Sequence, residues 1–183
     1  GDLLHIGAKE DVAPLLAALP DAPFGRYACL GNWDRWSGFT VDGLRTLFEG
    51  AGIQLLLNDH IPLTIRGRRL TLVGMDDALS GEPEPGLLST LPEGVPTLVL
   101  SHVPTLFPDL ASSGADIVLS GHTHGGQVRA PFKGALWMPM GSGDYDCGWF
   151  EEGGARLFVS RGIGTSVAPL RFLCRPEAAL IEI

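Results

Sequence analysis

The sequence lacks any long hydrophobic segment and has few cysteines. No run of about 18 consecutive apolar residues occurs, so this stretch contains neither a transmembrane helix nor a recognisable signal peptide. The three cysteines, Cys29, Cys147 and Cys174, are odd in number and widely spaced. They indicate buried thiols in a reducing compartment rather than a disulfide framework, with one pairing left open. They also lack the paired spacing of a closed structural zinc site.

Basic residues are also scarce relative to acidic ones. The chain has 13 Lys and Arg against 21 Asp and Glu, for a net charge of −8. This balance argues against a protein whose main role is to hold nucleic acid through its phosphates. A small phosphorylated substrate is still compatible with it, because metal ions can neutralise the phosphate. With 45% hydrophobic residues in a length of 183, the chain can bury the core of one domain.

The distribution of apolar residues predicts helices that alternate with strands. Val12 to Leu19 has helical spacing of apolar residues, and Thr40 can cap a second helix that buries Leu44 and Phe48. Short apolar runs bounded by turn residues predict strands, and these are Tyr27 to Leu30, Ile53 to Leu57, Ile61 to Ile65, Arg69 to Val73, Thr97 to Leu100, Ile117 to Leu119, Leu157 to Ser160 and Ala179 to Ile183. The alternation predicts an α/β fold with two mixed sheets packed together and helices outside.

Polar side chains recur directly beside the expected strands. Asp2 opens the chain, Asn32 follows one strand and His102 another, while His122 and His124 follow a third in a glycine-flanked loop. Strand ends are where sites form in open α/β sheets, and these side chains offer ligands that Mn²⁺, Zn²⁺ or Fe ions accept. Taken singly, each could instead be a cap or a turn residue, as Asn32 resembles. The two loop histidines favour the ligand interpretation most clearly.

Together these residues resemble the signature of the calcineurin-like metallophosphoesterases. The resemblance covers essentially the whole chain, and its later blocks are similar to the bacterial subgroup of YkuE- and YaeI-type phosphodiesterases. The motifs that carry it are Gly1-Asp2, Gly31-Asn32, Ser101-His102, Gly121 to Gln127, Ser160 to Ser166, Arg171-Phe172 and Cys174 to Glu177. The family implies a four-layer fold of two mixed sheets with flanking helices.

The resemblance also implies a role for each ligand of a two-metal centre. Asp2 is expected to bridge both ions, Asn32, His102 and His122 to complete one site, and His124 to belong to the other. The second site normally takes an Asp and a His from an Asp-x-His motif on the first strand, and no such motif precedes Asp2. We therefore expect residues 1–183 to be a single metallophosphoesterase domain that is N-terminally incomplete and lacks its first strand or strands.

One further departure from the family pattern concerns proton transfer. Relatives usually carry a histidine where this sequence has Trp33 in Gly31-Asn32-Trp33-Asp34, and that histidine helps the leaving group depart. Trp33 cannot exchange a proton in that role. His5 is the candidate replacement, with Asp34 and Asp76 as lesser ones, and the alternative is that His5 only packs against Trp33.

The resemblance implies a phosphohydrolase that uses two divalent ions and a metal-activated water. Mn²⁺ is the expected ion, with Zn²⁺ or Fe as alternatives. The expected substrate is a small phosphate ester, first of all a diester that is phospholipid-like or a lipid-linked nucleotide. A phosphomonoesterase or phosphoprotein phosphatase is the alternative, and a catalytically weak metal-binding scaffold another. For Arg129, Arg161 and Arg171, a structural role is weighed against phosphate binding.

The expected location is the cytoplasm or the periphery of a membrane. Attachment to a membrane would run through the missing N-terminus, export stays open for the same reason, and no nucleic-acid partner is expected.

Overall fold

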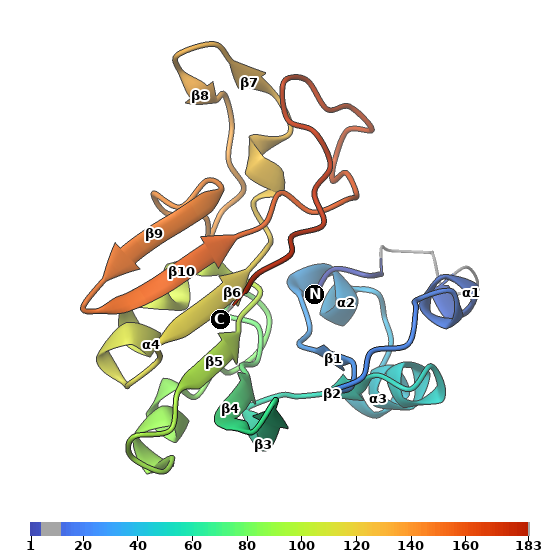
Figure 1. Ribbon diagram of the computed structural model, residues 1–183. Coiled ribbons are helices and arrows are strands. Elements are labelled where there is room, and N and C mark those ends of the chain that lie inside the picture. The colour runs from blue at the N-terminus through green and yellow to red at the C-terminus, as the bar shows by residue number, and fades with distance from the viewer. Residues whose placement is uncertain (5–11, 183) are drawn as a thin grey trace.

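A six-stranded mixed sheet organises the larger part of the molecule. The computed structural model describes residues 1–4 and 12–182 (Figure 1). The strand order is β3-β4-β5-β6-β10-β9, with the bounds β3 Asp59–Ile65, β4 Arg68–Gly74, β5 Thr97–Leu100, β6 Ile117–Ser120, β10 Ala155–Val159 and β9 Gly148–Glu152. The four central strands, β4, β5, β6 and β10, are parallel to one another, while β3 and β9 are antiparallel edges. The carboxyl ends of β4, β5, β6 and β10 therefore meet at one edge.

The core of this sheet is built from alternate side chains of the central strands. Val99, Val118 and Leu157 have no exposed surface, and they pack with Phe107 and Leu110 of helix α4 (Phe107–Ser112). Burying a side chain of this size contributes about 1.5–3 kcal/mol. Packing against α4 thus stabilises the sheet below the edge where its parallel strands end.

A second, smaller group of elements lies on the right of Figure 1. Strands β1 (Tyr27–Ala28) and β2 (Gln54–Leu55) pair in parallel, beside the helices α1 (Val12–Ala17) and α3 (Val41–Gly50). Thr40 caps α3 by accepting a hydrogen bond from the Gly43 amide. The buried side chains of this group are Leu4, Val12, Leu16, Leu30, Leu44, Phe48, Ile53 and Leu55.

Short elements complete the fold and bring the strand ends together. Helix α2 (Asn32–Trp36) follows β1, and a hairpin of β7 (Arg129–Ala130) and β8 (Gly134–Ala135) extends upward in Figure 1. Residues 161–173 run beside this hairpin. A parallel β-bridge pairs Phe172 of this segment with Val128, which directly precedes β7. The 3-10 helices are η1 Pro85–Thr90, η2 Pro104–Leu106 and η3 His124–Gly126. Among the described residues, no helix has the length and apolar character needed to span a membrane.

The α/β class, the mixed sheet and the flanking helices are confirmed. One strand prediction was wrong, because residues 179–182 form no strand, and the edge beside β10 is instead taken by β9. Asn32, which resembles a turn residue in the sequence, begins helix α2. The other sheets within the described residues are two short pairs, β1–β2 and β7–β8.

Candidate metal centre

Three predicted ligands converge at the edge where the parallel strands end. The possible ligand atoms of Asp2, His102 and His122 all lie within 4.8 Å of one another. The Asp2 carboxylate is 2.9 Å from Nε2 of His102, and Nδ1 of His122 is 3.3 Å from the same nitrogen. Asn32 joins the group, since its Oδ1 lies 3.1 Å from Nδ1 of His122. Segments far apart in the chain thus place two imidazoles, a carboxylate and an amide around one point.

The backbone at these positions is unusual for residues with side chains. Asp2, His122 and His124 have φ values of 59°, 65° and 51°, in the left-handed region that side chains rarely adopt. Such residues cost about 1–3 kcal/mol each and cluster at functional sites. Here they turn the side chains of Asp2 and His122 toward the same point.

The outer nitrogen of His122 is held by the protein. Its Nε2 lies 2.8 Å from the backbone carbonyl of Met140, and because a carbonyl only accepts, Nε2 carries the proton. The lone pair of Nδ1 then faces Asn32 and His102. A ligand histidine that donates its other N–H to a carbonyl is the usual arrangement in metal sites. The residues present therefore fit a divalent ion.

Ionisation states in the cluster also suit metal binding. Burial lowers the pKa of His122, and the adjacent His102 lowers it further. Burial raises the pKa of Asp2, but hydrogen bonds from His102 and the Trp33 amide outweigh this, so that the pKa of Asp2 lies below its ordinary value. A neutral imidazole and an ionised carboxylate are the forms that coordinate metal ions.

His124 lies beside this group rather than in it. Its Nδ1 is 3.4 Å from the carbonyl of Gly164, and burial is the main cause that lowers its pKa. Its side chain lines the same two cavities as Asp2, Trp33 and His122. The structure thus brings four of the five predicted ligands together and places the fifth on the adjacent wall.

Two cavities of different character open onto the cluster. One is an apolar pocket of about 180 Å³ whose walls include Trp33, Trp36, Leu79, Trp137 and Val167. The other is a groove of about 610 Å³ between the strand ends and residues 160–166. A ligand held at the cluster would have an apolar side and a more open side.

Comparisons with known proteins agree with this arrangement. The chain is 32% identical over 176 residues to the uncharacterized metallophosphoesterase YkuE of Bacillus subtilis strain 168, covering 95% of this chain and 61% of the relative. It is 34% identical over 183 residues to the phosphodiesterase YaeI of Escherichia coli K12, covering 98% of this chain and 64% of the relative. These similarities support the calcineurin-like metallophosphoesterase superfamily as the family of this chain.

The matches cover only part of the relatives. The chain spans 61% and 64% of the length of these two relatives. No family model matches the chain, and no solved structure matches it.

Asp34 is fully buried behind the cluster. Its carboxylate accepts hydrogen bonds from the backbone amides of Asp2 at 2.6 Å, Leu4 at 2.8 Å and Gly31 at 2.9 Å. These contacts favour a positioning role over the proton transfer that the sequence suggested. An acidic residue at the third position of a helix, reaching back to the amide before it, is the sequence signal for such a role.

Trp33, which stands where relatives usually carry a histidine, lies in the wall of the apolar pocket. Its ring packs edge to face with Trp36, with centroids 5.4 Å apart. Its backbone amide donates a hydrogen bond of 2.9 Å to the Asp2 carboxylate. His5, the other candidate acid, lies outside the described residues.

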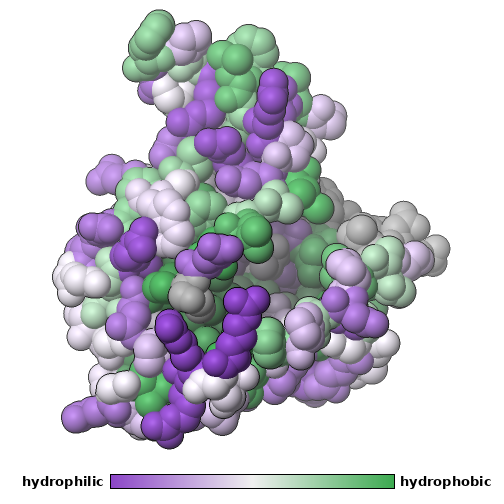
Figure 2. Space-filling view, in the orientation of Figure 1, coloured by the Kyte–Doolittle hydropathy of each residue, from purple (hydrophilic) through white to green (hydrophobic). Residues whose placement is uncertain are grey.

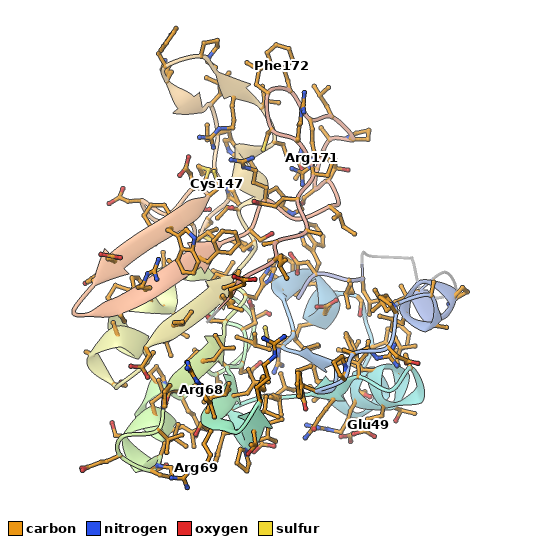
Figure 3. The ribbon with its side chains drawn as sticks, viewed as in Figure 1. Glu49, Arg68, Arg69, Cys147, Arg171 and Phe172 are labelled. Atoms are coloured by element: carbon orange, nitrogen blue, oxygen red, sulfur yellow. The ribbon has the colours of Figure 1, made fainter. Side chains whose placement is uncertain are left out.

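Two of the three arginines considered for phosphate binding, Arg129 and Arg171, mainly hold loops. The Arg171 guanidinium donates to the carbonyls of His124, Arg161, Gly162, Gly164 and Cys174. Figure 3 shows Arg171 where the upper loops meet the rest of the molecule. Arg129 forms an ion pair of 2.8 Å with Asp146 and donates to the carbonyl of Gly125. These contacts connect the loop of His124 to the neighbouring loops. The sequence left open whether the arginines have a structural role or bind phosphate, and for these two the contacts favour the structural role.

Proposed function

We propose that this protein is a metal-dependent phosphodiesterase that uses two divalent ions. The observation that carries the proposal is the convergence of Asp2, His102, His122 and Asn32, which successive contacts of 2.9, 3.3 and 3.1 Å connect. Support comes from the names of the relatives, one of which is called a phosphodiesterase. We also infer that residues 1–183 act as a single metallophosphoesterase domain.

The ligand assignment follows the positions of the side chains. Asp2, Asn32, His102 and His122 would hold one ion, and Asp2 with His124 would contribute to the second. Ions bound there would supply Lewis-acid activation of water and of the phosphoryl group. Oxygen and imidazole donors suit Mn²⁺, which we propose as the working ion.

Residues around the ligands would orient the substrate and keep its surroundings dry. Asp34 and the Trp33 amide hold Asp2 in place through its backbone and side chain. Trp33 and Trp36 form an apolar wall directly beside the ligands. A wall of this kind excludes water from one side of a bound ester, which strengthens the electrostatic interactions on that side.

The apolar pocket supports a substrate with an apolar arm. A diester has two arms, of which one could occupy the pocket beside Trp33 and the other the open groove lined by residues 160–166. A phospholipid-like ester or a lipid-linked nucleotide has this chemistry. We propose that class as the substrate.

The test is hydrolysis of two chromogenic esters by the purified protein with Mn²⁺. Bis-p-nitrophenyl phosphate reports diesterase activity, and p-nitrophenyl phosphate reports monoesterase activity. Asp2→Ala should lower diester cleavage by more than the roughly 10–100-fold seen when supporting groups of metal sites are changed. Asp42→Ala, at an exposed position of α3, is the matched control and should leave the rate unchanged.

The outcomes separate the candidate functions. Asp2-dependent cleavage of the monoester alone would replace the diesterase with a phosphomonoesterase. Stoichiometric Mn²⁺ binding in calorimetry without cleavage of either ester would favour a metal-binding scaffold instead.

A further inference from the structure

Exposed hydrophobic side chains gather in one part of the molecule. Among the described residues, nine of the fifteen large hydrophobic side chains that are exposed lie in residues 128–140 and 163–173, which we call the apolar lobe. Phe132 is fully exposed, Val167 is 84% exposed and Met140 is 78% exposed. Figure 2 shows hydrophobic surface on this upper part of the molecule, with hydrophilic side chains interspersed. Contiguous exposed apolar surface marks an interaction site.

The lobe is a hydrogen-bonded frame rather than a loose loop. The amide of Arg129 donates to the carbonyl of Phe172 at 3.0 Å, and the amide of Phe172 donates to the carbonyl of Gln127 at 2.9 Å. The side-chain amide of Gln127 donates to the carbonyls of Ala168 and Leu170. With its polar backbone groups paired in this way, the lobe presents apolar side chains outward, as Phe172 does in Figure 3.

The lobe also differs from the rest of the chain in charge. Residues 125–143 and 160–176, which contain the lobe and its flanks, include five basic residues and no acidic residue. Of these five, Arg129 is paired with Asp146 of the adjoining segment. All 21 acidic residues therefore lie elsewhere, together with only eight basic ones. Lys133 and Arg175 are exposed in this basic part of the chain, and Lys133 directly follows the fully exposed Phe132. Aromatic and basic side chains side by side suit the boundary of an anionic lipid layer.

The lobe is continuous with the candidate site. Trp137, Met140 and Val167 are exposed lobe residues and also line the apolar pocket beside His122. The carbonyl of Met140 is the group that holds Nε2 of His122. A surface that contacts the lobe would therefore adjoin the mouth of the pocket.

We propose that the apolar lobe docks on the surface of a membrane containing anionic phospholipids. Phe132 enters the boundary between headgroups and acyl chains, and Lys133 contacts the headgroups. Pairing with a second copy of this chain is disfavoured, because a symmetric interface would bring the two basic lobes together. Docking on the membrane does not require the proposed hydrolase activity, so each is measured without the other.

The test is cosedimentation of the protein with vesicles of phosphatidylcholine alone or mixed with phosphatidylglycerol. Stronger binding to the anionic vesicles is expected, and added salt should weaken it. Phe132→Ser should weaken binding by roughly tenfold or more. Lys133→Ala should weaken binding to anionic vesicles by about fivefold and leave the neutral vesicles unaffected. Phe132→Trp should retain binding.

Matched controls lie outside the lobe. Leu180→Ser changes a side chain that is 92% exposed, and Arg68→Ala removes a charge at the opposite end of the molecule (Figure 3). Neither should alter vesicle binding, and Phe132→Ser should cleave soluble bis-p-nitrophenyl phosphate as the parent does.

Three results would overturn the proposal. These are equal binding by the parent and the Phe132→Ser variant, absence of binding to anionic vesicles, and a dimer in light scattering that Phe132→Ser converts to a monomer. A protein that binds vesicles as expected but cleaves no ester would instead overturn the proposed function alone.

Discussion

The carboxylate of Asp34 accepts a hydrogen bond of 2.6 Å from the backbone amide of Asp2, although 32 positions separate them in the chain. The same carboxylate accepts from the amide of Gly31 at 2.9 Å. One buried side chain therefore joins the segment that carries Asp2 to the turn that precedes Asn32. Two candidate metal ligands depend on this link for their relative position.

Replacing Asp34 tests that link. Asp34→Asn keeps the shape but puts an NH₂ group against backbone amides that need an acceptor. Each buried group left without a partner costs about 1–3 kcal/mol, so the free energy of unfolding should fall by about that amount in urea denaturation. Affinity for Mn²⁺ should fall with it by roughly 10–100-fold. Asp42→Asn on the exposed face of α3 is the control, and an equally stable Asp34→Asn variant with unchanged affinity would contradict the positioning role.

Gly31 should tolerate no side chain. A Cβ atom there would lie 2.2 Å from Oδ1 of Asp2 and 2.6 Å from its amide nitrogen. Because the backbone cannot yield cheaply, Gly31→Ala should displace Asp2 and weaken Mn²⁺ binding, as titration calorimetry would measure. Gly50→Ala is the matched control, since a Cβ on Gly50 meets nothing within 4 Å. Its affinity should equal that of the parent, and so would that of Gly31→Ala if the close approach were unimportant.

Replacing Arg171 should lower the stability of the protein unless the new side chain can donate hydrogen bonds to several acceptors at once. Arg171→Met leaves the partly buried carbonyls of His124 and Arg161 without this donor, which should lower the free energy of unfolding by roughly 1–3 kcal/mol. Because the loop of His124 is loosened, the number of Mn²⁺ ions bound at saturation should decrease. Arg171→Lys retains the charge but not the planar fork, so it should recover only part of the loss. The exposed Arg68→Met serves as control, and full recovery by lysine would show that charge alone matters.

Metal-free protein should lose stability as the pH falls through the histidine range. The pKa of His122 is lowered from its ordinary value of 6.5, first by burial and then by His102, and that of His124 is lowered mainly by burial. Below pH 6.5 the unfolded chain binds these protons before the folded one does, so the free energy of unfolding falls. The lowered pKa of Asp2 acts only below its ordinary 3.8, outside this range.

Urea denaturation in EDTA from about pH 8 to about pH 5.5 measures the effect. His122→Asn should flatten the profile, whereas the exposed His60→Asn should reproduce the parent. A parent profile that rises toward low pH would contradict the sign of the shift.

Local sequence patterns determined the class of fold and most of the candidate ligands. The apolar spacing around Leu44 and Phe48, the cap at Thr40, and the strands that end before His102 and His122 depend on neighbours a few positions away. Periodicities of helix and strand are properties of such short windows. Polar residues directly after buried strands could therefore be recognised as a potential site before any contact was known.

Tertiary structure determined the features that depend on contacts between residues far apart in the sequence. Asp34 became a support because its partner amides come from another segment, and Arg171 because the carbonyls of a distant turn surround it. The pairing of β9 with β10 and the absence of a strand at 179–182 depend on cross-strand contacts and packing, which local propensity does not contain. The lobe at Phe132 likewise exists only where residues 128–140 meet residues 163–173, because hydrogen bonds between the two segments hold it in place.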